Sequence, residues 1–217
     1  MPKVYIDPGH GGEDSGAPGN GYFEKDIVLE VSKILNKKLN ELPNFETRMS
    51  RTDDTFKSLS FRSNDSNNWG SDIFVSIHAN SSDNLKAKGV ETYAFAEEYK
   101  HLADCVQKGL LSVNLPYIDR GVKFENWHVV RETQCNACLT EIGFISNSED
   151  INILLQYDTI AEGILKGILE YFQISYSEQP TNSLYYVFTN CYKIKSNAEQ
   201  EITELKSKGI QAYIKEV

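Results

Sequence analysis

Long apolar runs are missing from this sequence, and its amino terminus lacks the features of an export signal. No window approaches the roughly 18 uninterrupted apolar residues of a membrane-spanning helix. The chain starts MPKVYID, in which only three apolar residues in a row precede a carboxylate, whereas a secretory signal has a longer apolar stretch. We therefore expect synthesis in the cytoplasm without a signal peptide, followed by release to any target beyond the membrane.

Cysteines and basic residues are also scarce. Four cysteines among 217 residues do not make a disulfide framework, so reduced thiols are expected. Lysine and arginine number 22 against 31 aspartates and glutamates, a net charge of −9 that argues against a nucleic-acid partner. Hydrophobic residues nevertheless make up 40% of the chain, as in ordinary globular proteins, so a sizeable core is expected.

Strand-like and helix-like segments alternate along residues 1–174. Short β-branched or aromatic runs predict strands at 4–6, 73–77, 89–95 and 139–144, the third with one face toward solvent. Apolar residues at three- and four-residue steps predict helices at 24–42, 102–113 and 150–172. This alternation predicts an α/β fold with a mostly parallel or mixed central sheet flanked by helices.

The chain changes character at a polar stretch, 175–182, which predicts a linker after the domain of residues 1–174. The tail, 183–217, has strand-like runs at 184–188 and 210–214. Between them Ala198, Ile202 and Leu205 form a helical stripe. We expect a small C-terminal βαβ unit, too short to bury a core alone.

Three residues with metal-ligand side chains stand where a predicted strand ends or a predicted helix begins: His10, Glu24 and His78. In parallel sheets these ends gather along one edge, so the three side chains can converge. Two imidazoles and a carboxylate with one open position are typical of a catalytic zinc site. Each residue alone has a structural alternative, either a core histidine or a glutamate that favours the helix dipole.

Glu141 is the candidate catalytic carboxylate, because it stands inside an otherwise apolar strand. Burying its charge is unfavourable unless a metal or hydrogen bonds compensate. A zinc-activated water needs a base and the leaving nitrogen needs an acid, and one carboxylate can serve both in turn. The alternative is a buried salt bridge with Arg131 or Arg62.

Five motifs follow one another in an order that resembles the zinc-dependent N-acetylmuramoyl-L-alanine amidases of the amidase-3 type. They are IDPGHGGEDSGA at 6–17, EKD at 24–26, RTD at 51–53, SIHAN at 76–80 and EIGFISN at 141–147. The resemblance covers residues 3 to about 173. It implies one zinc ion held by His10, Glu24 and His78, with Glu141 as the catalytic residue. It also implies that Asn80 and Arg131 line the site.

The resemblance further implies a peptidoglycan hydrolase that cleaves the amide between N-acetylmuramic acid and the L-alanine of the stem peptide. Its partner is bacterial peptidoglycan, and without a signal peptide a phage or prophage endolysin is expected. One alternative is a host autolysin or sporulation amidase of the same chemistry. Others are a zinc hydrolase of another wall amide bond and a non-catalytic wall-binding protein.

Two further features are interpreted separately. Cys135 and Cys138 form a C-x-x-C pair, which can be a redox pair or half of a zinc site. Residues three apart face opposite sides of a strand, so reduced packing cysteines are expected.

The tail resembles half of a SPOR-type peptidoglycan-binding domain, which suggests wall binding or completion by a second tail in a homodimer. A small βαβ cap is the alternative.

Overall fold

The computed structural model describes residues 1–175 and 195–207. The chain divides into two units, 1–176 and 177–217. In the second unit the structure describes one helix, α7 (Lys195–Ser207), which confirms the helix expected through Ala198, Ile202 and Leu205. The strands expected at 184–188 and 210–214, and nearly all of the expected linker, lie outside the described residues.

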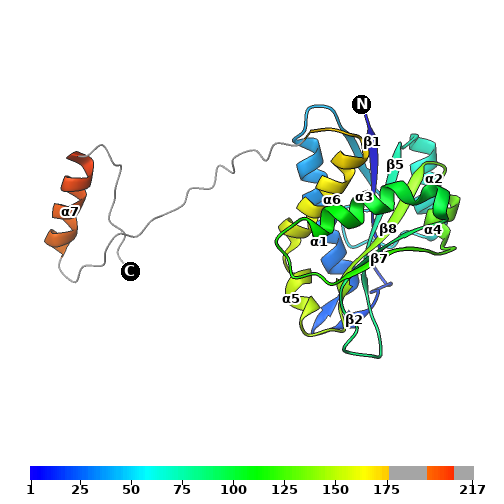
Figure 1. The fold of residues 1–217 in the computed structure, drawn as a ribbon, viewed down its shortest axis with the longest axis horizontal. Coiled ribbons are helices and arrows are strands. Elements are labelled where there is room, and N and C mark those ends of the chain that lie inside the picture. The colour runs from blue at the N-terminus through cyan, green and yellow to red at the C-terminus, as the bar shows by residue number, and fades with distance from the viewer. Residues whose placement is uncertain (176–194, 208–217) are drawn as a thin grey trace. The chain divides into compact units, whose positions relative to one another are not determined.

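A six-stranded mixed sheet, in the order β4-β1-β5-β8-β6-β7, forms the centre of the first unit (Figure 1). Its strands are β1 (Lys3–Pro8), β4 (Glu46–Met49), β5 (Ile73–Asn80), β6 (Val90–Ala94), β7 (Asp119–Phe124) and β8 (Asn136–Phe144). β4, β1, β5 and β8 are parallel, whereas β6 is antiparallel to β8 and parallel to β7. A separate two-stranded ladder joins β2 (Pro18–Gly19) and β3 (Tyr22–Phe23). The predicted α/β architecture is confirmed.

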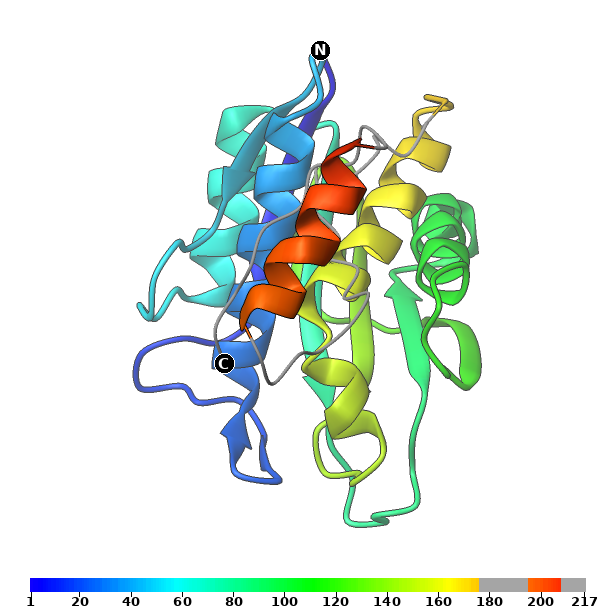
Figure 2. The same cartoon turned by 90° about the vertical axis from the view of Figure 1, so that its left-hand side faces the viewer.

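Helices cover both faces of this sheet (Figures 1 and 2). One face carries α1 (Glu24–Asn40), α3 (Lys100–Leu111) and α6 (Tyr157–Tyr171), which share the larger apolar core. The other face carries α2 (Leu59–Trp69) and α4 (His128–Glu132) around a smaller cluster that includes Tyr5 and Phe74. Ile77 belongs to the larger core, so His78, the next residue of β5, points to the face of α2 and α4.

The larger core depends on a close approach between α3 and α6. Gly109 of α3 faces Gly163 and Gly167 of α6, and a Cβ added to Gly109 would lie 2.3 Å from the Gly163 carbonyl oxygen. Glycine therefore lets the two backbones touch.

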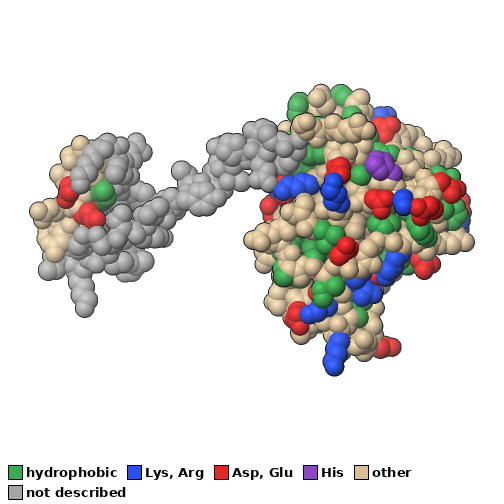
Figure 3. Space-filling view, viewed as in Figure 1, with side chains coloured by type: hydrophobic (Ala, Val, Ile, Leu, Met, Phe, Trp, Pro, Cys, Tyr) green, Lys and Arg blue, Asp and Glu red, His purple; other side chains and the backbone are tan. Residues whose placement is uncertain are grey.

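On the outer surface drawn in Figure 3, acidic and basic side chains of the described residues are interspersed. Among the described residues, none of the helices combines the length and apolarity needed to span a bilayer.

The structure corrects one predicted helix. The continuous helix expected at 150–172 is two helices, α5 (Asp150–Leu154) and α6, separated where Gln156 has φ −87° and ψ 55°. The two helices have different anchors, because the Asp150 carboxylate accepts from the N–H groups of Gly89 and Phe144, whereas α6 packs on α1 and α3. Both helices pack apolar side chains into the larger core. The spacing of apolar residues at three- and four-residue steps therefore continues through the break, and the sequence does not reveal it.

Several elements were not expected, namely β2, β3, β4, β7, α2, α4 and the short 3₁₀ helix Glu97–Tyr99. α2 has clear end signals, since the Ser58 side chain accepts from the Phe61 N–H and Gly70 ends the helix at φ 71°. Its buried residues are polar or charged, so no apolar stripe marks it. β6 also differs from expectation, because all of its residues are buried.

Candidate metal centre and active site

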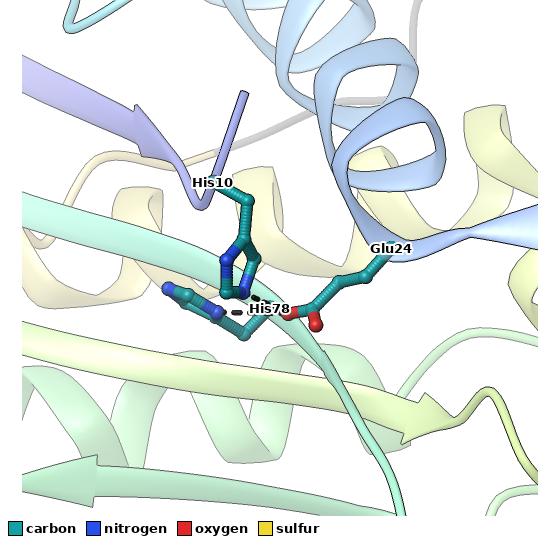
Figure 4. A group of neighbouring side chains, drawn as sticks. All are labelled: His10, Glu24 and His78. Atoms are coloured by element: carbon teal, nitrogen blue, oxygen red, sulfur yellow. Dashed lines mark hydrogen bonds and ion pairs between the residues drawn. The ribbon is translucent and has the colours of Figure 1, made fainter. Parts of the chain in front are cut away.

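His10, Glu24 and His78 meet at one edge of the sheet (Figure 4). His10 follows β1, Glu24 opens α1 and His78 lies in β5. Glu24 Oε1 is 3.1 Å from His10 Nε2 and 2.8 Å from His78 Nδ1. The three ligand atoms lie within 4.8 Å of one another. The structure thus brings together the three residues that the sequence singled out as ligands.

Two glycines allow this approach. A Cβ on Gly9 would lie 2.3 Å from His78 Cε1, inside the ring's van der Waals envelope. A Cβ on Gly16 would lie 2.6 Å from His10 Cδ2 and 2.7 Å from Glu24 Oε2, and Gly16 has φ 62°, which favours glycine. The glycine-rich loop therefore makes room for the imidazoles and the carboxylate to converge.

Neighbouring groups orient the three side chains. Asp14 Oδ2 is 2.8 Å from His10 Nδ1, which leaves His10 Nε2 turned toward Glu24. The Ala17 and Ala79 N–H groups donate to the two Glu24 oxygens at 2.9 and 3.0 Å. Such outer partners fix the ring orientation and the carboxylate position at metal sites.

The electrostatics of the cluster favour the arrangement of an anion between two imidazoles. Burial opposes ionisation of Glu24, but the hydrogen bonds and charges of His10 and His78 hold its pKa well below the usual range. Burial also opposes a charged His10, but the Glu24 and Asp14 carboxylates outweigh this and raise the pKa of His10. Two imidazole nitrogens and a carboxylate oxygen are the donors that Zn²⁺ takes in catalytic sites, so these residues fit such an ion.

Two buried arginines hold the turn that carries His10. Arg51 donates to the carbonyl oxygens of Pro8 and Gly9 at 3.1 and 2.7 Å. Arg62 pairs with the buried Asp7 carboxylate at 2.7 Å and donates to the His10 carbonyl oxygen at 2.7 Å. These contacts replace the backbone partners that the turn itself lacks.

Glu141 stands beside His78 on the sheet. β5 and β8 pair in a register that places His78 opposite Glu141, and β8 and β6 pair with Glu141 opposite Glu91. Glu141 Oε2 is buried and has no hydrogen-bond partner among the described residues. Burial, reinforced by the charges of Glu24 and Glu91, raises the pKa of Glu141 well above its usual value.

The salt bridge considered for Glu141 is not found in the described part of the chain. Arg62 is engaged by Asp7 and by backbone carbonyls. Arg131, in α4, donates to Glu132 Oε1 at 2.6 Å and to Asn126 Oδ1 at 2.8 Å. Glu141 is therefore a half-buried residue next to the ligand cluster, and its buried Oε2 has no hydrogen-bond partner in the described part of the chain.

Asn80 leads to a residue that the sequence reasoning missed. Asn80 Nδ2 donates to Glu91 Oε1 at 2.7 Å. Glu91 is only 2% exposed and also accepts from the Tyr93 hydroxyl, Arg120 Nε and Lys123 Nζ. A charged residue inside a buried strand was the signal that singled out Glu141, and it applies to Glu91 as well.

A pocket of about 390 Å³ opens beside His10 and His78. The segment before α2 and the start of α4 supply its outer wall, which combines apolar and basic side chains: Phe56, Lys57, Leu59, Trp127 and His128. His128 Nε2 is 3.3 Å from Ser63 Oγ. The pocket offers a partly apolar surface for a ligand next to the cluster of His10, Glu24 and His78.

The cysteines form no second metal site in the described residues. Cys105, Cys135 and Cys138 are free, and Cys191 lies outside the described residues. Cys138 is in the larger core, whereas Cys135 packs against the smaller cluster on the other face. Burial raises the pKa of the Cys138 thiol far above the usual value, which suits an inert packing cysteine.

Comparisons with known proteins show which family the chain resembles. A family model described as N-acetylmuramoyl-L-alanine amidase matches residues 4–170. N-acetylmuramoyl-L-alanine amidase CwlM of Bacillus licheniformis is 36% identical over 221 residues, which cover 99% of this chain and 85% of the relative. The sporulation-specific N-acetylmuramoyl-L-alanine amidase of Bacillus subtilis is 35% identical, with 99% and 84% covered.

Likeness to an endolysin and to a solved structure is confined to a smaller share of the chain. The endolysin of Bacillus phage SPP1 is 35% identical over 179 residues, which cover 77% of this chain and 65% of the relative. The crystal structure of an N-acetylmuramoyl-L-alanine amidase from Clostridium difficile 630 has a TM-score of 0.76 and 38% identity. It covers 79% of this chain and 97% of that chain.

Proposed function

The chain belongs to the family of N-acetylmuramoyl-L-alanine amidases, and from this premise we propose that His10, Glu24 and His78 hold one zinc ion. We further propose that Glu141 is the catalytic carboxylate. The reaction is hydrolysis of the amide between N-acetylmuramic acid and the L-alanine of the peptidoglycan stem peptide. The observation that carries the proposal is the convergence of three ligand atoms next to a buried carboxylate oxygen that has no partner among the described residues.

Each side chain has a role that its position supports. When bound, zinc polarises the scissile carbonyl and supplies an activated water. Asp14 holds the His10 ring so that Nε2 faces the ion site. Glu141 takes the proton of the attacking water and delivers it to the alanine nitrogen that leaves.

Digestion of purified peptidoglycan tests the proposal. We expect intact stem peptides with free L-alanine amino termini, identified by mass spectrometry, and loss of product after chelation with recovery on adding zinc. Glu141→Gln should lower the rate by at least about a hundredfold while the variant still binds one zinc ion per chain. His78→Ala should lose both zinc and activity.

Other outcomes would contradict particular parts of the proposal. New amino termini at residues other than L-alanine would indicate a hydrolase of another wall amide bond. Unaltered walls that retain the protein would indicate a non-catalytic wall-binding protein. Full activity of Glu141→Gln would remove Glu141 from the mechanism, and full activity in zinc-free protein would remove the metal.

The relatives whose alignments extend over the tail indicate whether the protein is a host amidase or an endolysin. The two alignments that cover 99% of this chain are to bacterial amidases, one of them specific to sporulation. The endolysin alignment covers 77%. We therefore favour a host amidase that acts on the cell wall over an endolysin. Measuring the amount of protein during sporulation and after prophage induction distinguishes the two.

A further inference from the structure

A row of side chains crosses the sheet and leads from the ligand cluster to two basic residues. His78 of β5, Glu141 of β8 and Glu91 of β6 occupy paired positions, so their side chains stand on the same face. Arg120 and Lys123, both in β7, contact Glu91 Oε2. The Glu91 backbone lies one strand spacing, roughly 5 Å, beyond Glu141, and the Arg120 and Lys123 charges lie at the Glu91 carboxylate.

Two cationic side chains lie beside one carboxylate at this end of the row. Arg120 and Lys123 together carry two charges, and Glu91 neutralises one. Glu91 is fully used as an acceptor, because its Oε1 receives the Asn80 amide and the Tyr93 hydroxyl. The Arg120 and Lys123 side chains remain 34% and 38% exposed. Arg120 donates to Glu91 through Nε, which leaves its terminal nitrogens for a second acceptor.

The proposed chemistry assigns this side of the site to the leaving peptide. The acyl carbon must lie at the ligand cluster, and Glu141 must reach the alanine nitrogen that departs. A peptide that begins at this nitrogen and follows the row of paired side chains runs from Glu141 toward Glu91. Two residues span about 7 Å, so the second residue of the stem peptide reaches Arg120 and Lys123. That residue carries an α-carboxylate as D-isoglutamate and a neutral amide as D-isoglutamine.

Resting on the amidase function proposed above, we propose that Arg120 and Lys123 form a subsite for the α-carboxylate of the second stem-peptide residue. A guanidinium and an ammonium bind a carboxylate through charge-assisted hydrogen bonds, and an uncharged amide cannot replace its charge. Glu91 is the positioning residue of this subsite, because it fixes both cations beside the path of the leaving peptide. The enzyme consequently prefers walls with D-isoglutamate over walls in which this residue is amidated.

Two synthetic substrates, muramoyl-L-alanyl-D-isoglutamate and muramoyl-L-alanyl-D-isoglutamine, test the subsite with the full-length zinc-loaded chain. The wild type should cleave the carboxylate form with a kcat/KM on the order of tenfold higher than the amide form. Arg120→Gln and Lys123→Gln should each bring this ratio toward one, mainly by slowing cleavage of the carboxylate form. Arg120→Lys should retain most of the preference, because the charge remains.

Lys108→Gln is the matched control, since Lys108 pairs with Glu170 on α6, remote from this face, and its loss should leave the ratio unchanged. A wild-type ratio near one, or an unchanged ratio in both glutamine variants, would overturn the subsite while leaving the amidase function intact. No cleavage of either substrate would instead count against the amidase function. Calorimetric binding of the product dipeptides L-alanyl-D-isoglutamate and L-alanyl-D-isoglutamine then decides the subsite independently. If thermal melting shows that Arg120→Gln does not fold, Lys123→Gln carries the test.

Discussion

At the scale of single residues, the position of His10 depends on groups that are not ligands. His10 itself has φ 58°, an unfavourable value for a residue with a side chain, so its surroundings must compensate. Arg51 supplies much of this compensation, because one guanidinium that is 2% exposed donates to carbonyl oxygens from three segments. These oxygens belong to Pro8, Gly9, Lys25 and Asp53.

Replacing Arg51 with methionine should therefore impair both stability and catalysis. The change leaves buried carbonyl groups without donors, which should lower the free energy of unfolding by about 1–3 kcal/mol. The displaced His10 turn should lower kcat/KM by roughly tenfold or more. Thermal unfolding and hydrolysis rates check both effects. Arg48→Met, at a largely exposed position paired with Asp65, should change stability by less than about 0.5 kcal/mol. An Arg51→Met variant as stable and active as the wild type would contradict the anchoring role.

At the scale of elements, α3 and α6 approach so closely that their contact is made by backbone. A Cβ on Gly109 would lie 2.3 Å from the Gly163 oxygen and 2.5 Å from the Gly167 nitrogen. Neither backbone atom can move away without shifting a whole helix. α3 also packs on β6 and β8, the strands that carry Glu91 and Glu141.

Gly109→Ala should therefore destabilise the fold although alanine is the better helix former. Overpacking costs about 1–3 kcal/mol, and the gain of about 1 kcal/mol in helix propensity does not offset it fully. Denaturant unfolding measures the net change, and a stabilised Gly109→Ala variant would show that the contact is looser than described. Asp104→Ala on the exposed side of α3 serves as the control, for which we expect little change.

At the scale of the whole molecule, the described site lies entirely in the first of two units. The larger apolar core is likewise formed by residues of this unit. The described site and the described core are complete without the tail, and the wall-binding or pairing role that the sequence suggests for the tail stays a prediction.

A chain ending at residue 176 should keep its fold and its zinc. Its kcat/KM on a soluble muramoyl dipeptide should stay within about twofold of the full chain, because the reacting groups are all present. Binding to insoluble peptidoglycan, measured by co-sedimentation, should fall. Sedimentation velocity of both chains tests pairing, since only the full chain should self-associate. Equal wall binding and equal mass of both chains would refute both proposed roles of the tail.

Sequence alone predicted the α/β architecture and the three residues whose side chains meet at the candidate metal centre. His10, Glu24 and His78 follow strands or open a helix, and in a parallel sheet those ends share one edge whatever the details of packing. Glu141 could be singled out as a candidate site residue from the sequence, because a charge inside an apolar strand requires compensation by a metal or by hydrogen bonds. Tertiary structure alone decided that Glu91, Arg120 and Lys123 stand beside Glu141, because the register of β5, β8, β6 and β7 depends on contacts between segments far apart in the chain. The polar helix α2 likewise became evident only in the tertiary structure. Its buried Arg62 pairs with Asp7, which lies 55 residues away in the sequence.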